Sequence, residues 1–163
     1  MAELLEEIDV TEEDSQKDKF LTFSLGKEFY GVEIIYVTEI IGIQPITEVP
    51  ELPVYIKGII NLRGKIIPVM DVRLRFKKEA NDYNDRTCII VIDVKEISIG
   101  LIVDAVSDVL DISSQDIVPP PDVNVNSHNR FIKGIGKVGN DVKLLLDCEK
   151  LISDDDAQSL TNI

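Results

Sequence analysis

The side chains with the chemistry for catalysis are few in this sequence, and their spacing does not favour it. The one histidine, His128, lies in a polar stretch that follows three consecutive prolines. A lone histidine in a loop is typical of a solvated side chain rather than of a metal ligand or a catalytic base. No Walker loop, Cys-x-x-Cys, Gly-x-Ser-x-Gly or His-Glu-x-x-His motif is present.

Three carboxylates, Asp104, Asp108 and Asp111, could bind a metal ion or act as an acid–base pair. At strand spacing, Asp104 and Asp108 share one face and Asp111 lies on the other. The order of acidic residues also differs from that of a calcium-binding loop. We therefore expect a solvated strand face here.

The glycines of the run Gly134-x-Gly136-x-x-Gly139 imitate a dinucleotide-binding loop. This run is embedded in a strand-like segment and is not followed by an amphipathic helix, so a turn is the better interpretation. The sequence thus predicts no catalytic residue, no metal site and no cofactor, and the protein is expected not to be an enzyme.

An arginine at a tight turn is the side chain best suited to recognition. Residues 59–71 contain two apolar strands flanking Arg63-Gly64, where glycine allows a positive φ. Arginine presents a planar fork of five donors that suits carboxylates and protein interfaces. Glu39 could pair with Arg63 and orient this fork, although an exposed pair adds only about 0–1 kcal/mol to stability. The alternative is an ordinary exposed arginine at a hairpin tip.

The elements that must position these residues are strands. Lys19–Leu25 alternates with a period of two, and Cys88–Val94 and Ile97–Val103 are β-branched runs that predict a hairpin. Proline and glycine interrupt the chain often, and long helical periodicity is absent. The fold class is therefore mostly β. Cys88 and Cys148 lie in apolar strand-like runs and are expected to be buried free thiols.

Two segments of the chain repeat. Residues 31–41 resemble residues 100–110, and residues 55–59 resemble 131–135; in each copy an Asp follows a Gly by 13 residues. The repeat predicts two related units, about 20–76 and 88–148, each a small barrel, with strand exchange between them left open. The alternative is chance alignment of Ile-, Val- and Gly-rich strands. Residues 137–140, which correspond to 61–64, keep the turn but lack the arginine. Residues 81–86 are the expected link, and 118–129 an extended loop.

The charge of the chain is concentrated at its ends. The net charge is −13, of which residues 1–19 carry −6 and residues 149–163 carry −3, leaving −4 for the body. Nucleic acid and anionic membranes require clustered Lys and Arg, so neither is the expected partner. No apolar run approaches a membrane span, and the first residues lack a basic flank, so a cytoplasmic protein without membrane insertion is expected.

Two other classes of function were weighed. A small-molecule or nucleic-acid-binding β-barrel would need a basic face rich in aromatic residues, whereas this chain has nine aromatic residues and no Trp. An enzyme with paired carboxylates would need a carboxyl group of strongly raised pKa in a deep pocket.

The strongest family signal lies in residues 55–64, followed by Pro68 and by Asp71-Val72-Arg73. Together with residues 30–34, 37–40 and 46–50, this run closely resembles the signature of CheW-type chemotaxis adaptor domains. The resemblance covers about residues 19–150. It leaves residues 1–18 as a flexible acidic tail and 151–163 as a C-terminal tail. The length fits a stand-alone adaptor rather than a kinase or a CheV protein.

The resemblance implies two SH3-like five-stranded β-barrels packed together. It also implies a non-catalytic adaptor that binds the regulatory domain of a CheA-type histidine kinase and the cytoplasmic tip of methyl-accepting chemotaxis receptors, in the cytoplasm at membrane receptor arrays. The receptor-facing positions that carry over are Val37, Glu39, Gly58 and Arg63. For the kinase-facing surface, only Gly134 carries over.

Overall fold

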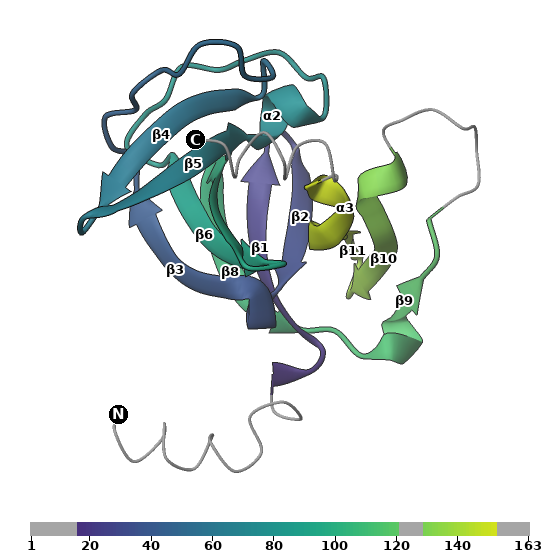
Figure 1. Cartoon of the computed structure of the whole chain (residues 1–163). Coiled ribbons are helices and arrows are strands. Elements are labelled where there is room, and N and C mark those ends of the chain that lie inside the picture. The colour runs from purple at the N-terminus through teal and green to yellow at the C-terminus, as the bar shows by residue number, and fades with distance from the viewer. Residues whose placement is uncertain (1–15, 121–128, 153–163) are drawn as a thin grey trace.

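Two β-sheets form the body of the protein (Figure 1). The structure is a computed structural model and describes residues 16–120 and 129–152. The six-stranded sheet has the order β8-β1-β2-β11-β10-β9 and consists of β1 (Lys19–Leu25), β2 (Glu28–Glu33), β8 (Ala105–Asp111), β9 (Ile117–Val118), β10 (Ile132–Val138) and β11 (Asp141–Leu146). The five-stranded sheet has the order β3-β6-β7-β5-β4 and consists of β3 (Val37–Gly42), β4 (Ile56–Leu62), β5 (Lys65–Asp71), β6 (Cys88–Val94) and β7 (Ile97–Val103).

Helical structure in the described residues is limited to single turns. They are η1 (Ile34–Tyr36), α2 (Val72–Arg75), η2 (Ser114–Asp116), η3 (Asn129–Phe131) and α3 (Cys148–Leu151). Asp71 caps α2 by accepting a hydrogen bond from the backbone N–H of Arg73 (3.0 Å), and Asp147 caps α3 in the same way from Lys150 (3.1 Å). The repeated aspartates of the sequence are therefore both N-caps. The expected mostly β class is confirmed.

The hairpin predicted from two β-branched runs is β6–β7. Its connecting residues Lys95 and Glu96 both have positive φ (51° and 66°), as a two-residue type I′ turn requires. Side chains of β6 alternate between two cores: Ile90 and Ile92 face one, Ile89 and Val91 the other. Because both faces are covered, the strand is apolar along nearly its whole length.

Each sheet contains a hairpin from the other half of the chain. The β1–β2 hairpin joins the strands of the C-terminal half, through β1 antiparallel to β8 and β2 parallel to β11. The β6–β7 hairpin joins β3, β4 and β5 in the same manner, through β6 antiparallel to β3 and β7 parallel to β5. The strand exchange that the sequence left open is therefore present. The division into units 20–76 and 88–148 stays a prediction.

Both sheets also curl (Figure 1), and one of them has six strands where the resemblance implies five. The chain that leaves β3 at one end of the five-stranded sheet returns at Thr47 to pair with Ile59 of β4 at the other end, with both N···O distances 2.9 Å. The chain that leaves β8 passes through η2 and pairs with β10 as β9. This arrangement is the physical basis of the SH3-like barrels that the resemblance implies.

Three clusters of buried side chains make up the core. The largest lies between the sheets and draws on both, and the other two fill the curl of one sheet each. The small clusters contain Ile60, Leu62, Ile67, Val69, Ile89, Val91 and Ile102 in the five-stranded sheet, and Phe20, Ile112 and Leu145 in the six-stranded sheet.

Two expectations about the cysteines need correction. Both are free thiols, but only Cys148 is buried. Cys88 is half-buried and is the first residue of β6. Cys148 opens the helical turn α3 rather than lying in a strand. His128 and most of the acidic N-terminal stretch lie outside the described residues. In the part that is described, no helix is long and apolar enough to span a bilayer.

Candidate functional site

Arg63 occupies the turn of the β4–β5 hairpin. Arg63 and Gly64 both have positive φ (54° and 88°), the same turn geometry as in the β6–β7 hairpin. An arginine rarely adopts this conformation. Here the side chain of Asn61 stabilises the turn, since its Oδ1 accepts a hydrogen bond from the N–H of Gly64 at 2.8 Å. The backbone therefore presents the Arg63 side chain at the tip of a projecting hairpin.

The predicted pairing of Arg63 with Glu39 is confirmed. Nη2 of Arg63 donates to Oε1 of Glu39, and the side chains are 70% and 29% exposed. Glu39 lies on β3, at the opposite end of the strand order from β4, and Figure 1 shows the tip of the β4–β5 hairpin near β3. The ion pair therefore joins the two ends of the curled sheet. Glu39 uses one of the five donors of the guanidinium group and orients the others toward solvent.

Val37 lies on the same strand as Glu39 but plays a different part. It begins β3 directly after η1 and packs, half-buried, against the core between the sheets. The register of β3 on β6 shifts between Val37 and Glu39, and Oγ1 of Thr38 donates to the carbonyl of Val91 at 3.1 Å. Such a bulge re-aims the side chains on either side of it. The structure thus brings Glu39 and Arg63 together, whereas Val37, two residues away on β3, packs toward the core between the sheets.

Gly58 lies on β4 and is buried. Its φ is 150°, and a Cβ built on it would lie 2.1 Å from the carbonyl oxygen of Thr47. The backbone bulges here, between Ile56 and Gly58, so that the returning chain can pair with β4. Gly58 therefore affects any surface only through the backbone around it.

Gly134 occupies the corresponding bulge in the six-stranded sheet and is also buried. A Cβ on Gly134 would lie 2.7 Å from Cγ2 of Ile117 and 3.4 Å from the carbonyl oxygen of Val118. Gly134 is on the other sheet from the remaining four candidates, so the candidates form two groups rather than one.

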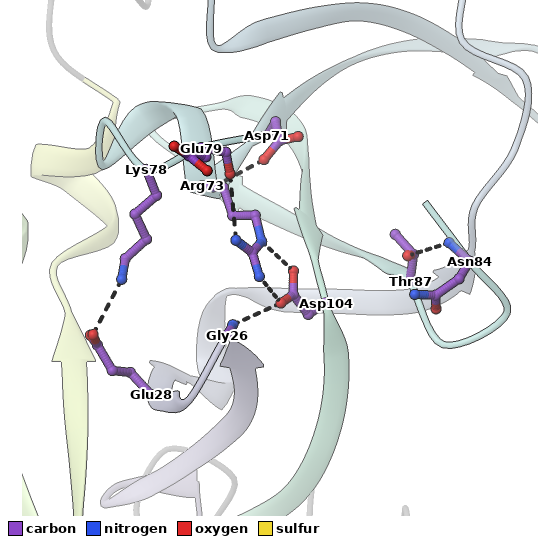
Figure 2. A network of polar contacts seen from close by, with 9 residues as sticks. All are labelled: Gly26, Glu28, Asp71, Arg73, Lys78, Glu79, Asn84, Thr87 and Asp104. Carbon is purple, nitrogen blue, oxygen red and sulfur yellow. Dashed lines mark hydrogen bonds and ion pairs between the residues drawn. The ribbon is translucent and has the colours of Figure 1, made fainter. Parts of the chain in front are cut away.

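The expectation that Asp104 lies on a solvated strand face is wrong. Oδ1 of Asp104 accepts from Nε of Arg73 at 2.7 Å, Oδ2 accepts from Nη2 of Arg73, and Oδ2 also accepts from the N–H of Gly26 at 2.7 Å (Figure 2). These hydrogen bonds hold the pKa of Asp104 below its usual range. The sequence offers no local signal for this pair, because Arg73 and Asp104 are 31 residues apart.

Asp108 and Asp111 have other partners than Arg73. Asp111 pairs with Lys19 at 3.3 Å on the surface, and the backbone N–H of Asp108 donates to the hydroxyl of Thr22. Within residues 16–120 and 129–152, no group of three or more His, Cys, Asp or Glu side chains could hold a metal ion.

The arrangement thus offers an exposed arginine that Glu39 orients for recognition, and the comparisons with known proteins identify the family. The family model of the CheW-like domain matches residues 19–156. The chain belongs to the CheW-like family. It is 37% identical to the chemotaxis protein CheW of Klebsiella aerogenes over 145 residues, which covers 89% of this chain and 87% of that protein.

Other CheW-like proteins extend the match. The chemotaxis protein CheW of Treponema pallidum is 32% identical over 92% of this chain and 91% of its own length. The crystal structure of the scaffolding protein TtCheW from Thermoanaerobacter tengcongensis superposes with a TM-score of 0.77 at 37% identity, covering 85% of this chain and 94% of that one. As a CheW-like protein, the chain is a non-catalytic adaptor of chemotaxis signalling.

Proposed function

We propose that this adaptor couples a CheA-type histidine kinase to the cytoplasmic tips of methyl-accepting chemotaxis receptors, in the cytoplasm at receptor arrays. Membership of the CheW-like family supports this class of partners. The observation that carries the receptor half of the proposal is the exposed guanidinium of Arg63, which Glu39 holds at the tip of the β4–β5 hairpin.

The receptor surface comprises Val37, Glu39 and Arg63, with Gly58 shaping the backbone below. An oriented arginine suits a carboxylate on a partner helix, because its parallel N–H donors can bind both carboxylate oxygens. Val37, half-buried on the same strand as Glu39, would meet the apolar stripe of an amphipathic receptor helix whose acidic residue binds Arg63.

The kinase surface is assigned to the six-stranded sheet, around the strand that carries Gly134. This sheet is distinct from the one that bears Arg63. Separate sheets allow both partners to bind at once, and two weak interfaces on one small protein suit assembly into arrays by avidity.

The organisation of the chain follows from the same proposal. Residues 19–150 form the adaptor domain of this proposal, made of the units 20–76 and 88–148, with residues 1–18 and 151–163 as its tails; Leu151 and Ile152, however, are buried in the core between the sheets, so the C-terminal tail begins after them. The matched pairing schemes of the two exchanged hairpins support the division into units.

The test is an Arg63→Ala variant in a binding assay with a receptor signalling fragment and, separately, with the kinase regulatory domain. We expect receptor affinity to fall about tenfold or more, as for an arginine at the centre of an interface. Kinase affinity should be unchanged. The matched control for receptor affinity is Lys137→Ala, a basic residue on the corresponding β10–β11 hairpin, which lies on the proposed kinase side and should leave receptor affinity unchanged. Unchanged receptor affinity of a folded Arg63→Ala variant would refute the assigned role.

A further inference from the structure

The chain crosses between the two sheets at two corresponding places. One is η1, which lies between β2 of the six-stranded sheet and β3 of the five-stranded sheet. The other is the single residue Asp104, between β7 of the five-stranded sheet and β8 of the six-stranded sheet. The relative placement of the sheets depends on how firmly these two crossings are held.

The Asp104 crossing is fastened by Arg73, in the α2 turn that follows β5. The guanidinium binds both carboxylate oxygens of Asp104, and its Nη1 also donates to the carbonyl of Glu79 at 3.4 Å (Figure 2). On the other side, Asp104 accepts from the N–H of Gly26 in the β1–β2 turn, and its own N–H donates to the carbonyl of Ser24 at 3.1 Å. Asp104 and Arg73, here called the clamp, thus tie α2 of one sheet to β1–β2 of the other.

At the other crossing, Glu33 directly before η1 pairs with Lys133 within the six-stranded sheet, and among the described residues the positions that match the clamp form no ion pair. By the sequence offsets of the repeat, Ile35 corresponds to Asp104 and Glu149 corresponds to Arg73. An apolar side chain and a carboxylate cannot form an ion pair. Glu149 lies instead near Tyr36, where burial raises the pKa of the phenol and the carboxylate raises it further. The clamp is therefore an asymmetric feature on an otherwise matched framework.

We propose that Arg73 is a positioning residue that fixes the receptor-binding sheet relative to the kinase-binding sheet, so that receptor signals reach the kinase. The shared core holds the sheets together, and two other polar contacts join them: Arg75 of α2 donates to the carbonyl of Leu151, and Lys78 pairs with Glu28 at 3.3 Å. Apolar burial itself has no preferred direction. A two-pronged arginine–carboxylate contact is directional, and its side chains are only 15% and 26% exposed, which limits screening by solvent. The coupling part of this inference rests on the function proposed above.

The geometric part is tested by distance measurements between spin labels. Labels at Ile66→Cys on β5 and Val142→Cys on β11 report on one sheet each, because the two strands belong to different sheets. Both side chains are about half exposed, so both positions can be labelled. Cys88 is replaced by Ala, and the buried Cys148 is retained. We expect Arg73→Gln to broaden the distance distribution relative to the parent chain.

Two further variants sharpen this measurement. Asp104→Asn removes the charge but keeps a side-chain oxygen that can accept from the N–H of Gly26. The distance distribution of the double variant Arg73→Gln, Asp104→Asn should be no broader than that of the broader single variant, since both changes act on one contact. The control Lys19→Gln removes the ion pair with Asp111, which joins strands within one sheet. It should leave the distribution unchanged. A distribution for Arg73→Gln as narrow as that of the parent chain would overturn the proposal.

The coupling part is tested with the full chain, a kinase and a receptor signalling fragment. We expect Arg73→Gln to keep each pairwise affinity within about twofold, because Arg73 lies outside both proposed surfaces. Receptor control of kinase activity should be lost. Retained control would overturn the coupling role. If the wild-type chain itself failed to bind either partner, the proposed function would fail, while the distance measurement would still decide whether Arg73 fixes the sheets.

Discussion

Replacing Gly58 by alanine should destabilise the protein far more than the same change at Gly134. The two glycines occupy corresponding bulges, but their surroundings differ. At Gly58 the φ of 150° is unfavourable for a residue with a Cβ, and the added methyl group would lie 2.1 Å from the backbone oxygen of Thr47. At Gly134 the nearest backbone atom lies at 3.4 Å, and the close contact is to a methyl group of Ile117.

The magnitudes follow from these contacts. Backbone strain at Gly58→Ala costs about 1–3 kcal/mol. Moving Thr47 away also removes its two backbone hydrogen bonds to Ile59, each worth about 1 kcal/mol. The free energy of unfolding should therefore fall by about 4 kcal/mol. Gly134→Ala displaces Cγ2 of Ile117, which is bonded directly to the Cβ of that residue, so Ile117 in the two-residue strand β9 must move; this is the low end of overpacking, about 1 kcal/mol.

Urea denaturation of the two variants distinguishes these values. With a slope of about 2 kcal/mol per M, the midpoint should fall by about 2 M for Gly58→Ala and by about 0.5 M for Gly134→Ala. Equal midpoints would show that the contact with Thr47 is not what requires glycine. Receptor affinity should also be measured for the folded Gly58→Ala protein. Comparing its loss of affinity with that of Arg63→Ala shows how much the backbone around Gly58 contributes to the receptor surface.

Three further predictions concern a carboxylate, a thiol and a phenol. Asp104 has a lowered pKa in the folded state, so its contribution to stability is complete above about pH 4 and is lost as the pH falls through that lowered value; the stability difference between wild type and Asp104→Asn should shrink in acid, as urea titrations across pH would record. Burial raises the pKa of the Cys148 thiol to about 12, so in a Cys88→Ala protein it should react with a disulfide reagent near pH 8 only at the rate of unfolding; fast labelling would contradict this. Tyr83→Phe removes the hydrogen bond from the phenol to buried Asp71 (2.8 Å) and should cost about 2 kcal/mol in urea denaturation; no change would mean that water replaces the phenol.

The sequence predicted most of what depends on neighbouring residues. Alternation identified β1 and the β6–β7 hairpin, and Gly64 marked the turn that presents Arg63. The pairing of Glu39 with Arg63, which are 24 residues apart, was also predicted, but from their opposite charges and not from any local pattern. The repeat predicted aspartates in matching places, and both proved to be helix caps.

Contacts between distant parts of the chain were not predictable in this way. Asp104 was expected to be solvated, because nothing near it in sequence carries the positive charge that it binds. Arg75 is a second case: it is buried between the rings of Tyr55 and Phe131, at 4.3 and 4.5 Å, and donates to the carbonyl of Leu151. A charged residue is buried only when tertiary structure supplies its partners, and period-two patterns do not contain that information.

The hairpin exchange has a consequence for synthesis on the ribosome. When residues up to the link at 81–86 have emerged, β1 and β2 have no β8 or β11 to pair with, and β3, β4 and β5 still lack β6 and β7. Neither sheet can be completed until the C-terminal half follows. The nascent chain must therefore hold unpaired apolar strands for most of its translation, which makes folding late and exposes it to aggregation. The same interlacing makes the finished molecule one cooperative unit that cannot be divided into two independently folding halves.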